Sequence, residues 1–391
     1  MKTQKSVYLL ALAVLAGTSV TAAPFLAIND NAEVFLKGGA GVRSDSNIFL
    51  SHSAPPGQSK SDTIFNLDVG AELKYGTQST LSGVLSVNDT FNRYSDHSNL
   101  NNNLADAHFS SNYDDEKLKF GFNVNYAELN DNQFEPSSTV LSRDYLVRRN
   151  VFDTGLNAEV SVSEKTSFGL GGSFAHTDYR RAGYADSDVL TMPLNYYLQV
   201  TPKVDLSLGY RYRNTSVTIG QDSRDDYYNV GTRGQFTPKL SGTLSVGLNR
   251  RNVAGQTEDQ LGIDSDLSYA YTPKTTINFG VSNDFGTSGQ GVQQKNLNFN
   301  GSIQTVISDQ WTLRAGGSFR NIEYANTAIP PAASNGRTDH YYEGQLGAIY
   351  TVNAYVRVTA AYSHRENHND KNVLPAEFTG DVVSLAVNFR Y

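Results

Sequence analysis

The residues best suited to chemistry in this sequence are arginines and aspartates that recur at alternate positions. Arg211 and Arg213 are two positions apart, and Asp264 and Asp266 repeat this spacing with the opposite charge. Residues two apart in an extended strand face the same side, so each pair would present two like charges to one compartment. Guanidinium groups bind anions and hydrogen-bond carboxylates, so such a surface could attract an anion or contact a sugar.

Further arginines share this alternating placement. The residues that we expect to line an aqueous interior, and to be candidates for solute contact, are Arg211, Arg213, Arg233, Arg314, Arg320, Arg357, Arg390, Asp264 and Asp266. An alternative is that inward arginines and acids pair with each other and only keep the wall in shape. A sugar path would also need inward aromatic rings, and Tyr341 is one of few candidates.

Catalysis has little support in the sequence. His364 and His368 are four residues apart with Glu366 between them, a spacing that brings two metal ligands together on a helix. They fall instead in a predicted rim and loop. The chain has no cysteine, which excludes disulfides and thiolate metal sites. We therefore expect no enzyme, no cofactor and no metal site. The remaining alternative is a barrel enzyme with a Ser–His or Asp–His pair at the outer rim.

Strands must position these side chains, and apolar residues do alternate with polar ones along most of the sequence. The last stretch, Thr379–Tyr391, has Val383, Leu385, Val387, Phe389 and Tyr391 on one face and mostly polar residues on the other. Half-apolar strands also explain a mean hydropathy of −0.42. A terminal strand with one bare apolar face predicts an all-β fold, a transmembrane antiparallel up-and-down β-barrel whose last strand pairs with its first. We expect that partner to be Glu33–Arg43.

Short turns give the strand number. Thr-Pro-Lys occurs at 201–203, 237–239 and 272–274, each time between two alternating runs, as in hairpin turns. Similar turns are predicted near Gly76, Asp115, Glu164, Pro202, Pro238, Pro273, Asp309 and Asn353. Eight inner turns, with both chain ends on the inner side, predict about eighteen strands. Sixteen is an alternative, because the pattern is unclear over residues 129–150. A barrel of either size is wide enough for water.

The N-terminal residues predict an export signal. Lys2 and Lys5 precede the apolar run Val7–Ala16, and small residues follow up to Ala22. The run is shorter than the roughly 20 residues that span a bilayer, so we expect cleavage after Ala22. Cleavage would leave 30 Lys+Arg and 39 Asp+Glu, a net charge of −9, with no basic run for nucleic acid. The expected division is a signal peptide at 1–22, a periplasmic tail at 23–31 and a barrel at 32–391.

Several segments resemble a known family. They are Asp45-Ser46-Asn47-Ile48-Phe49 and Ser61-Asp62-Thr63-Ile64-Phe65, together with Tyr-Arg-Tyr-Arg at 210–213 and the final Phe-x-Tyr. They resemble the putative β-barrel porin type 2 family, which includes outer-membrane barrels found with exopolysaccharide biosynthesis and export systems of Gram-negative bacteria. The resemblance implies an outer-membrane barrel and polysaccharide passage. Phe389 and Tyr391 look like the signal that the barrel-assembly machinery recognises.

The expected function is a porin-like channel for polar solutes, with exopolysaccharide export as the specific form that the resemblance implies. The alternative is a structural or surface-binding barrel with a blocked lumen. Expected partners are outer-membrane lipids, the assembly machinery and the polar solute or polysaccharide, while the oligomeric state is left open. Arg390 should lie in the lumen near the inner mouth, within reach of Glu33.

Overall fold

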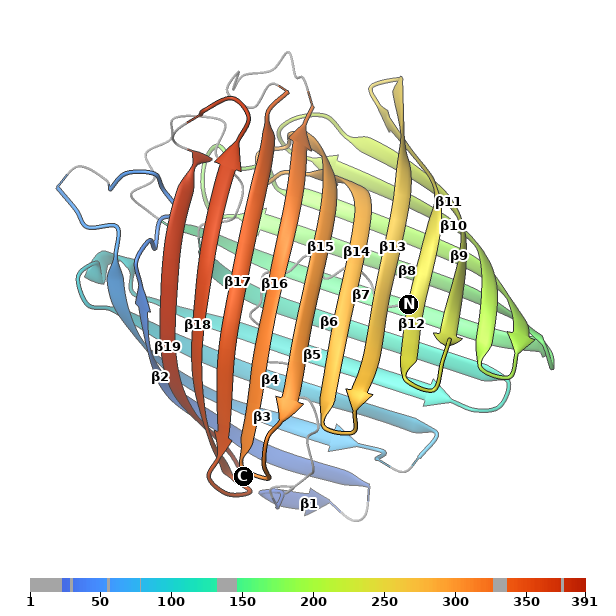
Figure 1. The fold of residues 1–391 in the computed structure, drawn as a ribbon, viewed down its shortest axis with the longest axis horizontal. Helices are drawn as coiled ribbons and strands as arrows, with labels where there is room; N and C mark the ends of the chain where they lie inside the picture. The colour runs from blue at the N-terminus through green and yellow to red at the C-terminus, as the bar shows by residue number, and fades with distance from the viewer. Residues whose placement is uncertain are drawn as a thin grey trace.

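The computed structural model describes residues 23–28, 31–54, 57–77, 79–131, 146–325, 336–373 and 376–391. The predicted signal peptide, residues 1–22, lies outside them. The described residues form one antiparallel sheet of nineteen strands, and eighteen of these, β2 to β19, close into a barrel because β19 pairs with β2 (Figure 1). This confirms the predicted fold and eighteen strands; the sixteen-stranded alternative is wrong.

The strands follow each other around the barrel in chain order. They are β1 (Leu26–Ile28), β2 (Ala32–Asp45), β3 (Asp62–Tyr75), β4 (Leu81–Tyr94), β5 (Asn102–Asp114), β6 (Leu118–Asp131), β7 (Val147–Ser163), β8 (Thr166–Tyr179), β9 (Ser187–Thr201), β10 (Val204–Val217), β11 (Ser223–Gln235), β12 (Leu240–Val253), β13 (Gln256–Thr272), β14 (Thr275–Thr287), β15 (Gln293–Val306), β16 (Trp311–Tyr324), β17 (Thr338–Thr351), β18 (Val356–Asn369) and β19 (Phe378–Arg390). The eight predicted turns join the strands at one end, here called the inner end; the loops at the other, outer end are longer. Ser98–Leu100 forms a single 3₁₀ turn, and no helix among the described residues is long and apolar enough to cross a membrane.

Alternation places the apolar side chains on the outside of the barrel. Val383, Leu385 and Val387 of β19 are all about half exposed. Their paired neighbours on β18, such as Tyr362 opposite Val383, are likewise exposed. Polar residues between them face the interior. The outer wall is therefore an apolar surface that lipid covers, and no apolar core fills the interior at mid-height among the described strands.

The seam between first and last strands is closed by main-chain bonds. Register runs from Val382 opposite Asp45 to Arg390 opposite Lys37, which confirms that β19 pairs with the predicted first strand. Tyr391 continues the ladder, since its N–H donates to the carbonyl of Leu36 at 2.9 Å and its carbonyl accepts from the Leu36 N–H at 2.6 Å. Closure leaves no free edge over this stretch.

Part of the predicted periplasmic tail is also structured. Beyond Tyr391, the edge of β2 is taken by β1, in which Leu26 lies opposite Val34 and Ile28 opposite Ala32. The ring of Phe25 packs edge-on against Tyr391, with centroids 6.2 Å apart. In Figure 1, β1 and the C-terminus lie together at the lower end of the barrel. The tail therefore extends the seam by three residues; the division into signal peptide, tail and barrel stays a prediction.

One glycine is required by close approach of two strands. A methyl group on Gly247, in the middle of β12, would overlap the carbonyl oxygen of Tyr228 on β11. Replacing Gly247 by alanine should therefore lower the free energy of unfolding by about 1–3 kcal/mol, as overpacking does. Gly344→Ala is the matched control, because a methyl group there would meet no described atom within 4 Å. Guanidinium unfolding of both variants tests this, and equal stabilities would contradict it.

The packed core of the molecule lies at its outer end. One cluster contains Leu50, Val292, Ile322, Tyr324, Tyr341 and Phe378, and a second contains Ile48, Phe49, Ile64, Tyr94 and Leu100. These residues come from the outer ends of the strands and from the β2–β3, β4–β5 and β14–β15 loops. The two clusters together are called the outer cap below. The cap narrows the outer mouth, whereas the barrel below it has a polar interior.

Candidate functional site in the barrel interior

The largest charged network lies in the outer half of the interior, along β10 to β14. Arg213 donates to Asp225 on β11 at 2.7 Å and to Asp284 on β14 at 3.0 Å. Arg211 donates to both carboxylate oxygens of Asp284, at 3.0 and 2.9 Å. Arg251 on β12 donates to Asp225 at 2.6 Å. Three arginines and two aspartates are thus paired and largely buried, so the pairing alternative holds for Arg211 and Arg213.

Three members of this network were not among the predicted site residues. Asp225 belongs to β11 and faces inward, although the sequence pattern favours an outer loop there. Asp284 and the neighbouring Phe285 lie where pairing between β13 and β14 ends, at Ile263 opposite Asn283. Phe285 is buried, with its ring 4.8 Å from the Arg251 guanidinium. Asp225 is an even number of positions from the inward-facing Arg233 on β11, and Arg251 lies opposite Asp225, so the strand period would have placed both inside.

Arg233 holds a second ion-pair cluster deeper in the barrel. It donates to Glu159 on β7 at 2.8 Å and to Asp205 on β10 at 2.9 Å. Its guanidinium also lies 3.4 Å from the ring centroid of Tyr197 on β9. The arginine therefore braces three neighbouring parts of the wall, and its charge is balanced by two carboxylates.

Arg390 lies in the lumen near the inner mouth, as predicted, but its partner is not Glu33. It donates to Glu72 on β3 at 2.8 Å and covers the ring of Phe35 at 3.5 Å. Lys37 and Lys74 each lie 3.6 Å from the same glutamate. Arg390 lies opposite Lys37 of β2, and Glu72 lies opposite Phe35 of the same strand, so the arginine side chain reaches Glu72 across β2. Glu33 lies farther along β2, beyond Phe35. One glutamate thus balances three cations.

Other predicted arginines line the wall from β16 to β2. Arg314 donates to the side chain of Gln304 at 2.9 Å, and Arg320 lies 5.4 Å from the Tyr341 ring centroid. Arg357 is close enough to Arg314 for the two charges to repel each other. Within the part of the chain that the structure describes, Arg357 and the inward-facing Arg43 have no acidic partner. Arg357 and Arg43 thus carry positive charge that no carboxylate among the described residues neutralises.

The acidic pair lies on another part of the wall. Asp264 and Asp266 both face inward from β13 and are exposed to the lumen. Neither forms an ion pair with another described residue, although Asp264 is within electrostatic range of Arg211. Among the described residues, Arg43 on β2 and Arg357 on β18 thus lie on other strands than the unpaired aspartates of β13.

More aromatic rings face inward than the sequence suggested, but arginines cover them. Tyr227 lies beneath Arg211, Tyr197 beneath Arg233, Tyr341 beneath Arg320 and Phe35 beneath Arg390. All four rings are less than 9% exposed. A sugar ring can stack only on an accessible aromatic face, so these residues do not form a sugar track.

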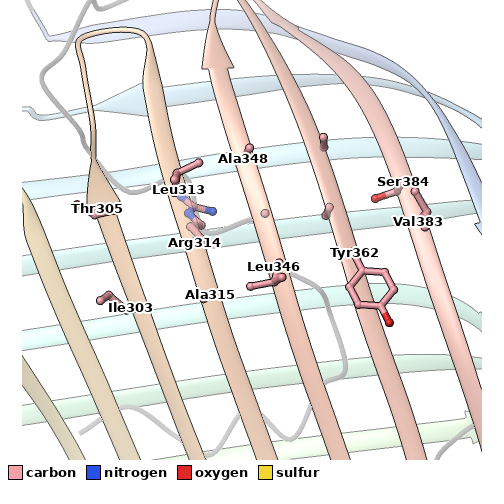
Figure 2. A pocket seen from close by; sticks show the side chains of 13 residues that line it. Ile303, Thr305, Leu313, Arg314, Ala315, Leu346, Ala348, Tyr362, Val383 and Ser384 are labelled. Atoms are coloured by element: carbon pink, nitrogen blue, oxygen red, sulfur yellow. The ribbon is translucent and has the colours of Figure 1, made fainter.

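A hollow of about 570 Å³ on the outside of the barrel is not part of this interior. Its floor is made by small residues, among them Ala315, Ala348 and Ala360, and larger apolar side chains surround them. Figure 2 shows Ile303, Leu346, Tyr362 and Val383 around it, on strands β15 to β19. These side chains belong to the lipid-facing set, so the hollow is a feature of the lipid-covered wall.

The predicted histidine and assembly-signal residues also lie on the outer wall. His364 makes a hydrogen bond with Asp381 at 2.8 Å, and His368 makes one with Glu366. No group of three or more His, Cys, Asp and Glu side chains among the described residues could hold a metal ion. Phe389 and Tyr391 are exposed near the inner end of β19, with parallel rings 6.4 Å apart. Their recognition by the assembly machinery stays a prediction.

Comparison with known proteins gives one family. The model of the family described as "Putative beta-barrel porin 2" matches residues 81–391. No curated protein sequence matches the chain significantly.

Solved structures with a similar course of the chain are bacterial outer-membrane barrels. OpdK of Pseudomonas aeruginosa, solved with vanillate, is 10% identical, with 92% of this chain and 99% of that one covered and a TM-score of 0.48. OpdQ of Pseudomonas aeruginosa is 9% identical, with 92% and 97% covered and a TM-score of 0.46. The ferric enterobactin receptor PfeA of Pseudomonas aeruginosa is 9% identical, with 91% and 80% covered and a TM-score of 0.44.

Proposed function

The chain belongs to the family of putative β-barrel porins 2, a porin-like barrel of the outer membrane, and from that premise we propose that it conducts polar solutes with a preference for anions. The observation that carries the proposal is the excess of cationic over acidic side chains among the described inward-facing residues of the wall from β16 to β3. In the inner half of this wall the described inward-facing charges are five cations, Lys37, Lys74, Arg314, Arg357 and Arg390, and two anions, Glu33 and Glu72. An anion crossing the inner mouth would be attracted to this wall.

The selectivity prediction concerns Arg357 and Arg43, which lack an acidic partner among the described residues. Replacing both by glutamine should lower the anion-to-cation permeability ratio by at least a factor of two. Replacing the paired Arg233 would instead disturb the wall, so it is not a useful test. The ratio is obtained from the reversal potential of single channels in planar bilayers under a KCl gradient.

The control for this test is Arg250→Gln. Arg250 pairs with Asp259 on the outer wall, where both side chains are nearly half exposed, so it has no access to the lumen. Its loss should leave the permeability ratio unchanged. Two results would overturn the proposed anion preference. One is a wild-type channel that prefers cations, and the other is an Arg43→Gln/Arg357→Gln variant with the same anion-to-cation permeability ratio as the wild type.

Exopolysaccharide export is the finer function that family resemblance implies, and it stays a prediction. The inward aromatic rings are covered by arginines, so a sugar polymer would have to be bound by charged and amide side chains. The prediction of export is tested by comparing the amount of exopolysaccharide that cells secrete with and without the barrel. Undiminished secretion without the barrel would leave solute diffusion as the function.

The second candidate function is a barrel with a blocked lumen that acts through its outer surface. The outer cap favours it, because buried apolar residues occupy the outer mouth. Bilayer recordings separate the two candidates: a protein that inserts, remains folded and never conducts would support the blocked barrel.

A further inference from the structure

Residues of the β2–β3 loop belong to both clusters of the outer cap. Ile48 and Phe49 pack with Ile64 of β3 and Tyr94 of β4, and Leu146, directly before β7, packs against this cluster. The next residue, Leu50, belongs to the other cluster of the cap.

The second cluster lies on another part of the rim. It contains Ile322 and Tyr324 at the outer end of β16, and Val292 from the β14–β15 loop. Strand β16 is separated from β4 by the five strands β17, β18, β19, β2 and β3. The consecutive residues Ile48–Leu50 therefore take part in two clusters on different parts of the rim.

A polar anchor holds the β2–β3 loop at its start. Asn47 is fully buried, and its side-chain amide donates to the carbonyls of Ser51 at 2.8 Å and Thr379 of β19 at 2.9 Å. Its side-chain oxygen accepts from the Ser51 N–H at 3.1 Å. Asp45 accepts from the Asn47 N–H at 2.9 Å and from Arg365 of β18 at 3.0 Å. The loop is thus tied to the two strands beside the seam.

Phe49 packs into a site whose other residues are held by hydrogen bonds of their own. Its ring meets His97 edge-on, with centroids 5.4 Å apart. His97 in turn makes a 2.7 Å hydrogen bond with Asp62, which also accepts from the backbone N–H groups of Ser95 and Asp96. The site belongs to β3 and the β4–β5 loop, so it stays in place whether or not Phe49 occupies it.

Leu50 carries a sign of strain. Its φ angle is +47°, in the left-handed region that leucine seldom adopts. Such a conformation persists only while surrounding contacts maintain it. Contact with Val292, Tyr341 and Phe378 supplies that support here. Release of Leu50 from this cluster would relieve the strain.

We propose that Ile48–Leu50 is the outer gate of the channel. The gate is closed in this structure and opens when Phe49 and Leu50 leave the two apolar clusters in which they are packed. This inference rests on the proposed channel function and adds where its flow is controlled. The gate is part of the loop between β2 and β3, next to the seam. The other cluster of the outer cap provides only apolar contacts for Leu50.

The first test removes the apolar contacts. In planar bilayers, the Phe49→Ser/Leu50→Ser variant should pass a mean current at least tenfold greater than the wild type, which should open briefly and rarely. The control is Ile219→Ser, which removes an exposed apolar side chain from another outer loop and should behave as the wild type. Heat-shifted electrophoretic mobility verifies that each barrel is folded.

A second test locks the gate without removing its anchor. The chain has no cysteine, so a Leu50→Cys/Val292→Cys pair can be crosslinked specifically. The oxidised protein should be closed, and a reductant should restore wild-type openings.

The outcomes separate the gate from the channel. Equal steady currents in the wild type, the Phe49→Ser/Leu50→Ser variant and the control would overturn the gate and leave the channel function standing. A crosslinked barrel that conducts as well as its reduced form would overturn the gate likewise. No current from any folded variant would overturn the proposed channel function, and the gate with it.

Discussion

Replacing Asp225 by asparagine is expected to lower the free energy of unfolding by about 3 kcal/mol. The carboxylate of Asp225 is 1% exposed and receives Arg213 and Arg251, which are themselves 12% and 3% exposed. Removing one partner of a buried ion pair costs about 3–5 kcal/mol, because the remaining charges lose their compensation without regaining water. Asparagine keeps the shape of the side chain, so the loss isolates the charge. Guanidinium unfolding in lipid vesicles, followed by the fluorescence of Trp311, measures it.

The matched control is Asp259→Asn. Asp259 also pairs with an arginine of β12, Arg250, at 2.7 and 2.8 Å, but its side chain is 42% exposed and that of Arg250 is 49% exposed. Exposed ion pairs contribute about 0–1 kcal/mol, since water solvates both charges when the pair is broken. If Asp225→Asn were no more harmful than Asp259→Asn, burial would not strengthen the ion pairs of Asp225 with Arg213 and Arg251.

Replacing Leu346 by arginine is the second substitution that we expect to lower the free energy of unfolding strongly. Leu346 lies at the middle of β17 and is 59% exposed on the lipid-facing wall. An arginine at the bilayer midplane of a barrel costs about 2–4 kcal/mol, because the charge must be taken from water into hydrocarbon. We therefore expect the unfolding free energy in lipid vesicles to fall by that amount.

The neighbouring position provides the control. Gln345 is adjacent in sequence but faces the lumen, opposite Ser363 of β18, and is itself exposed there. Gln345→Arg places the same side chain in water and should change stability by less than about 1 kcal/mol. Equal losses in the two variants would mean that the interior is not aqueous at this height.

His364, Glu366 and His368 lie in strand β18, whereas the sequence pattern predicted a rim and loop there. His364, Glu366 and His368 share one face of β18, since alternate residues of a strand do so. Extension along the strand at about 3.3 Å per residue keeps the two histidines apart, so each binds a nearby carboxylate instead of a shared ion. The face was predictable from the strand period, and the absence of joint ligation follows from its rise.

The sequence alone determined the barrel. Period-two alternation ending in Tyr391, together with eight short turns, was sufficient for eighteen strands and for the pairing of β19 with β2. These features are local: a turn needs only a few adjacent residues, and side-chain direction follows from the strand itself. The inward direction of Arg211, Arg213, Arg233 and Arg390 was predictable for the same reason.

Only the tertiary structure decided which charges are neutralised. Arg211 and its partner Asp284 are 73 positions apart in the chain, and Arg390 and Glu72 are 318 apart. Strand tilt and the end of β13–β14 pairing at Asn283 decide such meetings, and no period in the sequence records either. The packing of Phe49 and Leu50 in two clusters likewise depends on β4 and β16 being brought to one rim by closure of the sheet. Local pattern thus determined the wall, whereas the paired and open charges inside it, and the cap above it, arise from contacts that exist only once the ring is closed.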